Sequence, residues 1–249
     1  MDLASLSVLT VLIMATAVLY SAIGQAGASG YLAVMALVGM TSDVMKPTAL
    51  VLNILVASIA AYKFYRAGSF NRSLFWPLAV GSVPLAFIGG GLTLPDAIYK
   101  PVVAAVLLFA AFGLLRKPGS STSSQRTPFR PWAVVLIGVA IGFLSGLTGT
   151  GGGIFLSPLL LWLGWASTRE TAGVSAAFIW VNSVAGLLGH LSSVAFVPSF
   201  LPLLATAALI GGWIGAEIGS KRLAPYTMQR VLATVLVISG LRLLFIRDK

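Results

Sequence analysis

Apolar runs follow one another along the whole chain and are separated by short polar or glycine-rich stretches. A helix that crosses a bilayer needs about 20 apolar residues, and each half of the chain has three runs of roughly that length. These expected spans are residues 47–62, 74–92 and 97–115 in the first half and 171–191, 201–219 and 227–246 in the second. The apolar block that opens each half, 6–40 or 132–164, is too long for one span. The pattern therefore predicts an all-α polytopic membrane protein with one long block and three ordinary spans per half.

Glycine-rich stretches interrupt both long blocks. Residues 23–34 read IGQAGASGYLAV, and residues 142–158 read GFLSGLTGTGGGIFLSP. The glycines that recur at one spacing are Gly24, Gly27 and Gly30 in the first stretch and Gly146, Gly149 and Gly152 in the second. Because glycine weakens helices and permits tight turns, we expect each block to be a re-entrant or discontinuous helical segment.

A polar, serine-rich stretch bounded by prolines lies between the two sets of spans, at residues 117–131. Such a composition is typical of a linker. The expected organisation is a first membrane repeat at 1–116, this linker, and a second membrane repeat at 132–249.

Equivalent loops of the two halves carry opposite charge bias. The loop between the second and third segments holds Lys63, Arg66 and Arg72, whereas its counterpart at 192–200 holds no basic residue. The loop before the fourth segment shows the reverse, with one lysine in the first half and three basic residues in the second. Because cytoplasmic loops are enriched in Lys and Arg, the halves are expected to be inverted repeats with the linker on the cytoplasmic side.

Composition excludes several classes of function. The chain is 58% hydrophobic and 9% charged, whereas a soluble domain carries about 25% charged residues. Cysteine is absent, and a single histidine and six acidic residues leave little material for a metal site or a catalytic triad, so we expect no cofactor and no enzymatic activity. The net charge is +10, but the basic residues lie mostly at segment ends, where topology and lipid head groups account for them. Nucleic acid is therefore not an expected partner.

The second glycine-rich stretch carries a resemblance to a known family. Its run GFLSGLTGTGGG from Gly142 to Gly153, followed by Pro158, Leu159 and Leu160, resembles the TauE/SafE family, also called the sulfite exporter or TSUP family. The resemblance covers nearly the whole chain. It implies a multi-pass protein of the bacterial inner membrane that exports small sulfur-containing anions such as sulfite, thiosulfate or organosulfonates. The first stretch departs from the glycine-dense form, for example at Gln25 and Ser29.

The breaks suggest how such an anion could be held without a lysine. A helix that begins inside the membrane presents free N–H groups and the positive end of its dipole, and transporters with inverted repeats use discontinuous helices in this way. The half-helices are expected to begin near Gly30 and Gly152, and no Lys or Arg lies near the middle of an expected span. The candidate substrate-binding residues are Gln25, Gly27, Ser29, Gly30, Asn53, Thr148, Gly149, Thr150, Gly151, Gly152, Ser157, Ser175 and Asn182. The alternative is that the glycines only permit close helix packing and that the asparagines only bond neighbouring helices.

Two titratable residues are candidates for proton coupling. His190 lies near the end of its span and can titrate near neutral pH, but a capping or interfacial role is the alternative. Glu217 lies in a late apolar run four residues before Lys221, so an ion pair is its alternative. The alternative functions are a cation or metal permease, which would place carboxylates or histidines along its path, and an intramembrane enzyme, which needs a positioned nucleophile or metal. The middles of the expected spans hold almost none of these residues. The expected partners are therefore a small anion and the lipid bilayer, and a homo-oligomer is compatible with the sequence.

Overall fold

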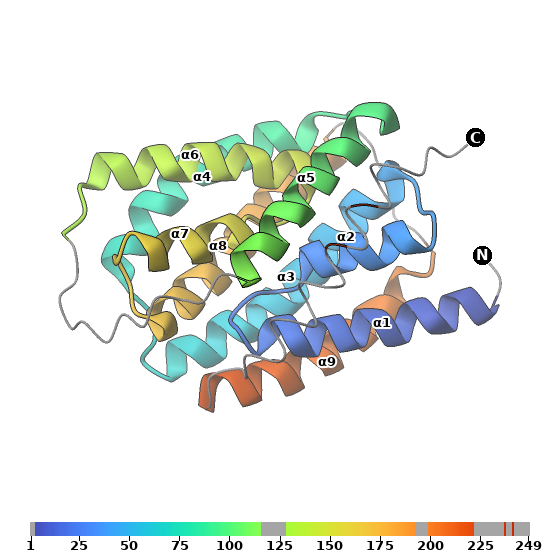
Figure 1. Ribbon diagram of the computed structural model, residues 1–249, viewed down its shortest axis with the longest axis horizontal. Coiled ribbons are helices and arrows are strands. Elements are labelled where there is room, and N and C mark those ends of the chain that lie inside the picture. The colour runs from blue at the N-terminus through green and yellow to red at the C-terminus, as the bar shows by residue number, and fades with distance from the viewer. Residues whose placement is uncertain (1–2, 116–127, 193–198, 222–236, 238–240, 242–249) are drawn as a thin grey trace.

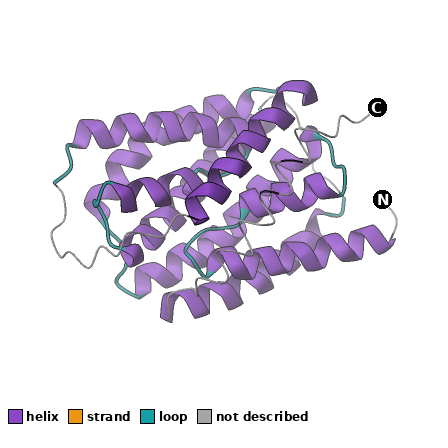
Figure 2. Cartoon of the chain, viewed as in Figure 1, coloured by secondary structure: helices purple, strands orange, loops and turns teal. Residues whose placement is uncertain are grey.

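The computed structural model describes residues 3–115, 128–192, 199–221, 237 and 241. Within these ranges the chain is helical, with turns and loops but no strand (Figure 2). The helices are α1 (Leu3–Ser21), α2 (Ala28–Leu37), α3 (Ser42–Arg66), α4 (Arg72–Gly91), α5 (Asp96–Leu115), α6 (Pro131–Thr148), α7 (Gly153–Trp162), α8 (Thr168–Leu191) and α9 (Leu201–Lys221), as labelled in Figure 1.

Five of the described helices, α3, α4, α6, α8 and α9, are long and apolar enough to cross a bilayer. The prediction of an all-α polytopic membrane protein is therefore confirmed. Of the expected span at 227–246, only residues 237 and 241 are described, so this span lies outside the described ranges. α3 begins at Ser42, five residues before the expected boundary at 47. Its first turn contains Asp43, whose charge favours a helix N-terminus. α8 likewise begins earlier than expected, because Ser167 and Glu170 form a capping box.

Both long apolar blocks are broken. α1 ends at Ser21 and α2 begins at Ala28, whereas α6 ends at Thr148 and α7 begins at Gly153. In Figure 1, α1 runs into the bundle from one end and α2 runs back toward that end. α6 and α7 follow the same course from the opposite end (Figure 1). The turn between the members of each pair lies inside the protein.

Two helix pairs join the halves of the chain through close backbone contact. α6 lies parallel to α4, and a Cβ on Gly138, Gly142 or Gly146 would overlap the carbonyl groups of α4. α9 lies parallel to α1, and a Cβ on Gly211 or Gly215 would overlap the carbonyl groups of α1, while one on Gly219 would overlap the carbonyl group of Ala22, just after α1. Such small-residue faces let helix backbones approach closely in a membrane. Helix packing therefore accounts for these glycines.

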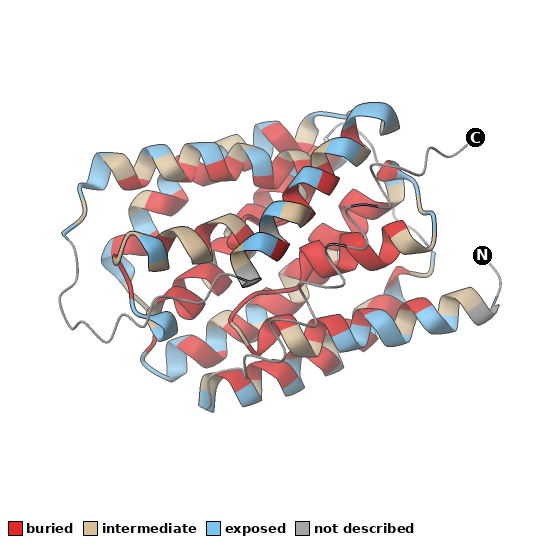
Figure 3. Ribbon diagram, viewed as in Figure 1, coloured by how far each residue is buried: buried red, intermediate tan, exposed pale blue. Residues whose placement is uncertain are grey.

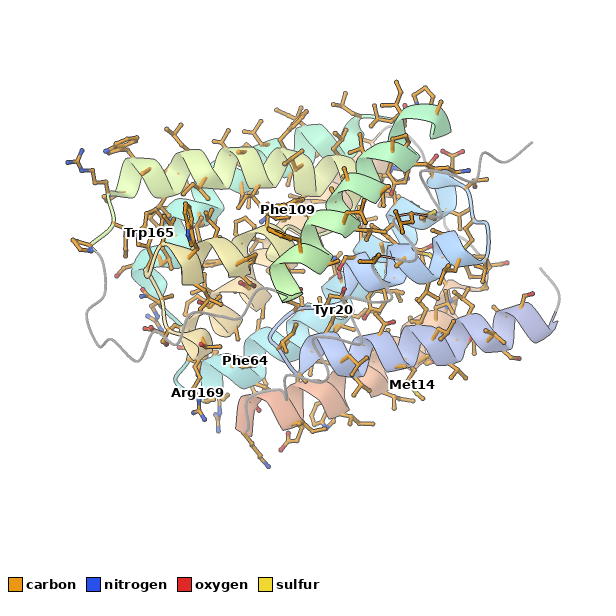
Figure 4. All side chains as sticks on the ribbon, in the orientation of Figure 1. Met14, Tyr20, Phe64, Phe109, Trp165 and Arg169 are labelled. Atoms are coloured by element: carbon orange, nitrogen blue, oxygen red, sulfur yellow. The ribbon has the colours of Figure 1, made fainter. Side chains whose placement is uncertain are left out.

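α3 and α8 cross in opposite directions at the centre of the bundle, where Leu50 contacts Gly186 and Asn53 contacts Ser183. The residues around this crossing are buried, and nearly all of α2 is buried as well (Figure 3). α5 covers α7: Phe109 of α5, labelled in Figure 4, packs on Phe155 of α7 with ring centroids 5.5 Å apart.

Charge is distributed unevenly between the two ends of the bundle. One end, which we call the basic end, holds the α3–α4 loop, the starts of α6 and α8 and the end of α9 (Figure 1). The described basic residues there are Lys63, Arg66, Arg72, Arg130, Arg169 and Lys221. Arg169 marks this end in Figure 4. The opposite end holds the start of α1 and the α4–α5 connection, and its described basic residues are Lys46 and Lys100.

Candidate functional site

The two breaks have the same backbone design. Gly27 and Gly152 are the N-caps of α2 and α7, and both have left-handed backbone angles, with φ of 103° and 80°. Gly24 and Gly149 also have positive φ, 74° and 80°, at the preceding ends of α1 and α6. The conformational pairs are thus Gly24 with Gly149 and Gly27 with Gly152, not the pairs that the sequence spacing suggested. The two helices before the breaks differ in length past their last glycine contact. α6 continues for two residues after Gly146, its last contact with α4, whereas α1 ends one residue before Ala22, the last contact with α9. This difference is about one helical turn.

Both helices that leave the breaks start inside the protein without a side-chain cap. α7 begins at Gly153, as expected, and α2 begins at Ala28, two residues before the expected Gly30. The first N–H groups of a helix have no acceptor within the helix, and they carry the positive end of its dipole. The first residues of both helices are buried. Each break therefore presents an uncapped helix N-terminus to the protein interior.

Polar side chains connect the two breaks. Gln25 Nε2, from the first break, donates a hydrogen bond of 3.4 Å to Ser157 Oγ of α7. Ser157 Oγ lies 2.9 Å from Ser175 Oγ of α8. Gln25 and Ser175 are buried. Three of the candidate binding residues, which lie far apart in the sequence, therefore form one hydrogen-bonded chain between the halves.

The second break carries further polar groups. Thr148 Oγ1 lies 3.0 Å from Thr150 Oγ1 and donates to the Leu144 carbonyl, so Thr150 is the donor between the two threonines. Tyr99 Oη donates to the Thr148 carbonyl at 2.9 Å. Both threonines are buried, at 0% and 4% exposure. This half of the candidate site is consequently dense in neutral hydroxyl groups.

Gly151 joins the second break to the α3–α8 crossing. A Cβ on Gly151 would lie 2.7 Å from Asn53 Nδ2 and 2.9 Å from Ser183 Oγ. Asn53 Nδ2 donates to Ser183 Oγ at 3.3 Å, while Asn53 Oδ1 is buried without a hydrogen-bond partner among the described residues. An unpaired buried polar atom costs free energy. Asn53 therefore has spare hydrogen-bonding capacity beside the glycine loop.

Other candidate residues bond within their own half. Ser29 Oγ donates to Tyr20 Oη at 2.8 Å, and Gly30 packs directly on Thr16 and Tyr20. These contacts hold α2 against α1, near the centre of the bundle where Figure 4 labels Tyr20. Asn182 Nδ2 donates to the Phe178 carbonyl of its own helix, and its Oδ1 has no partner in the described part of the chain.

The two proton-coupling candidates lie in different places. Glu217 pairs with Lys221, as the sequence indicated, and also with Lys63 of α3 at the basic end. His190 does not cap α8: its ring is buried at 3% exposure, and neither ring nitrogen has a partner within the ranges described.

Sequence reasoning missed two contributors to this region. Lys46 lies inside α3 because the helix starts at Ser42, and it is only 4% exposed. A lone lysine before an apolar run was the available signal. Tyr99 had no such signal, because its bond to Thr148 connects positions far apart in the chain.

Comparison with known proteins bears on what this arrangement does. A sequence model described as sulfite exporter TauE/SafE matches residues 9–243, which is most of the chain. The chain belongs to the TauE/SafE family. The probable membrane transporter protein y4hK of Sinorhizobium fredii is 39% identical over 233 residues, covering 92% of this chain and 94% of its own. The probable membrane transporter protein YjnA of Bacillus subtilis is 25% identical over 241 residues, covering 89% and 92%. No solved structure matches the TauE/SafE chain described here.

Family membership and the apolar helices agree with each other. The chain is a multi-pass membrane transporter of the TauE/SafE family, as the resemblance in the second glycine-rich stretch implied. The names of these two relatives give no substrate and no direction of transport.

Proposed function

We propose that this protein is a secondary transporter of the cell (inner) membrane that exports small sulfur-containing anions, such as sulfite, thiosulfate or organosulfonates. The observation that carries the proposal is the pair of uncapped helix N-termini, α2 and α7, which begin at left-handed glycines inside the protein. Buried N–H groups at a helix start favour a negatively charged ligand. An oxyanion has several acceptor oxygens, so it can accept hydrogen bonds from both ends and from neighbouring hydroxyl groups.

The anion in this proposal is held by neutral donors. Gln25, Ser157 and Ser175 already form a chain between the breaks, and Thr150 lies beside the start of α7. In the structure Gln25, Ser175 and Thr150 are buried and Ser157 is half-buried. Each of them is hydrogen-bonded to a neighbouring side chain. An incoming anion therefore replaces bonds between side chains with stronger, charge-assisted bonds. Because each bond is exchanged rather than newly formed, net binding stays modest and release is not slowed.

The two halves in this proposal are inverted repeats, 1–116 and 132–249, joined by the linker 117–131. The opposite directions of α3 and α8 at their crossing support this organisation. So do the opposite ends from which the α1–α2 and α6–α7 pairs enter the bundle (Figure 1). The excess of Lys and Arg at the basic end supports a cytoplasmic location for that end.

The experiment that tests the function is transport by the purified full-length protein in proteoliposomes. Initial rates of uptake of labelled sulfite, thiosulfate and taurine are compared with uptake of labelled phosphate and of a monovalent cation. We expect saturable uptake of at least one sulfur anion, inhibited by the others, and no cation uptake. Protein-free liposomes are the control for leakage.

Direction and coupling need a second arrangement of the same assay. Counterflow with unlabelled anion inside the vesicles tests reversible binding, and an imposed pH gradient of either sign tests proton coupling. Cation uptake in place of anion uptake, or absence of any sulfur-anion uptake, would contradict the proposal.

A further inference from the structure

Lys46 differs from the other buried lysine of α3. Lys63, at the basic end, pairs with Glu217. Lys46, near the opposite end, has no acidic partner among the residues that the structure describes. Its ammonium group donates instead to the carbonyl oxygens of Gly90 at 2.8 Å, Leu92 at 2.9 Å and Gly89 at 3.3 Å.

The partners of Lys46 only partly compensate its charge. The carbonyl groups at the end of a helix carry the negative end of the helix dipole, equivalent to about half an elementary charge. A lysine that is 4% exposed therefore leaves positive charge in a region of low dielectric constant. An anion beside it relieves this cost, because a buried charge requires a partner.

Lys46 lies directly against the second break. A Cβ on Gly149 would lie 3.2 Å from the Lys46 carbonyl oxygen and 3.3 Å from its Cγ. Gly149 is the C-cap of α6, and Thr150 follows it. The backbone and the start of the Lys46 side chain thus lie beside the loop whose glycines lead into α7, and its ammonium group lies at the end of α4.

The turn of α8 that carries His190 packs on the same turn of α4. Its neighbour Gly189 packs on the Phe87 carbonyl and lies close to the Gly91 backbone nitrogen. The ring of His190 is within electrostatic range of Lys46 and of Asp43. Asp43 is exposed, whereas His190 is buried and both its ring nitrogens lack partners in the described ranges. A buried imidazole with unused hydrogen-bonding capacity is suited to an oxyanion ligand that Lys46 also binds.

We propose that Lys46 and His190 form a second anion subsite, between the second break and the end of the bundle opposite the basic end. The subsite takes a small oxyanion of the transported class, so this inference rests on the proposed function. The anion replaces α4 carbonyl groups as acceptor of hydrogen bonds from the Lys46 ammonium group, and it accepts a hydrogen bond from the His190 ring. Lys46 is then the residue that selects anions, and favours divalent over monovalent ones.

Thiosulfate uptake and thiosulfate-dependent thermal stabilisation of the full-length protein test this subsite. The variants are Lys46→Met, Lys46→Arg and His190→Asn, with Lys221→Met as the control, because Lys221 is a lysine with 73% exposure of its side chain. We expect Lys46→Met to raise the KM for thiosulfate about tenfold or more and to abolish stabilisation by the anion. Lys46→Arg keeps the charge and most of the uptake. His190→Asn raises KM about threefold, and Lys221→Met changes it less than about twofold.

A role of Lys46 limited to capping α4 gives a different result. Lys46→Met would then lower the melting temperature without anion but leave the KM, the preference for divalent anions and the anion-induced shift unchanged, which overturns the inference. If Lys46→Met fails to fold, His190→Asn decides the question. A KM for thiosulfate and a preference for divalent anions equal to those of the wild type in His190→Asn would also overturn the subsite. Wild-type protein that neither transports nor is stabilised by a sulfur anion refutes the proposed function itself, which is a separate outcome.

Discussion

The two breaks share a backbone and differ in what surrounds it. In the first break, Tyr31 Oη donates to the Ala26 carbonyl at 2.7 Å, and Gly30 packs on the side chains of α1. In the second, Tyr99 makes the corresponding kind of bond to Thr148, but threonines line the turn and Gly151 lies against Asn53. Gln25 is the hydrogen-bonding side chain that the first break extends to the other half.

This difference indicates that duplicated backbone geometry does not entail duplicated chemistry. A left-handed glycine before a helix is needed in both breaks to turn the chain. The threonine hydroxyl groups, the spare oxygen of Asn53 and the Lys46 side chain lie around the second break. In the first break, the hydroxyl groups of Ser29 and Tyr31 are bonded within their own half. We therefore infer that the second break contributes most of the substrate contacts and that the first mainly supplies a helix N-terminus. Four variants or variant pairs test this inequality.

The largest effect is expected at equivalent positions in the middle of the loops. Gly151→Ala places a side chain at φ of 72°, which costs about 1–3 kcal/mol, and its Cβ displaces the Asn53 amide and Ile179. We expect the initial rate of thiosulfate uptake to fall at least about tenfold. Ala26→Gly, at the equivalent position of the first break, removes one buried methyl group and lowers the rate less than about threefold. Equal losses in the two variants would refute the inequality.

A smaller effect is expected from the polar side chains. Thr150→Val keeps the shape of the side chain but removes the donor to Thr148 Oγ1, so we expect KM to rise about fivefold to tenfold. Gln25→Leu breaks the 3.4 Å bond to Ser157, and we expect a rise of only about twofold to threefold. KM is measured with thiosulfate in proteoliposomes, with melting temperature as the control for folding. A larger rise for Gln25→Leu would reverse the assignment.

Removing the two tyrosine hydroxyl groups separates stability from transport. Tyr31→Phe and Tyr99→Phe each leave a buried carbonyl without its donor, which costs about 1–3 kcal/mol of the free energy of unfolding. We expect similar losses of thermal stability in both variants. Only Tyr99→Phe should slow uptake, by about twofold to threefold, because it loosens the loop that holds Thr148 and Thr150. Slower uptake by Tyr31→Phe alone would contradict this expectation.

The smallest effect is expected away from both breaks. Glu217→Gln removes the ion pairs with Lys63 and Lys221, which lie at the basic end and away from both breaks. We expect uptake within about twofold of wild type at every pH gradient tested. A loss of pH-gradient dependence in this variant would instead assign Glu217 to proton coupling.

The sequence predicted the parts of this fold that depend on local pattern. Hydrophobic run length located the candidate spans α3, α4, α8 and α9, and the glycine-rich stretches located the breaks, since both signals lie within a few residues of their effect. The pairing of Glu217 with Lys221 was likewise visible, because residues four apart share a helix face. The start of α7 at Gly153 followed from the same local logic.

Features that depend on packing between distant segments were not predictable. The bond between Gln25 and Ser157 and the burial of Lys46 both result from where whole helices lie. The sequence spacing paired Gly24 with Gly146, whereas the backbone angles pair Gly24 with Gly149, for a related reason. The pairing depends on how far α6 continues beyond its contact with α4, which the spacing of the glycines alone does not reveal.

The glycine contacts between α4 and α6 and between α1 and α9 limit how this transporter can move. Each of these pairs takes one helix from each half of the chain, and backbone atoms are in contact along both seams. Rocking one half of the sequence against the other would open both seams and forfeit their dispersion contacts. We therefore expect the rigid bodies of the transport cycle to combine helices from both halves of the chain.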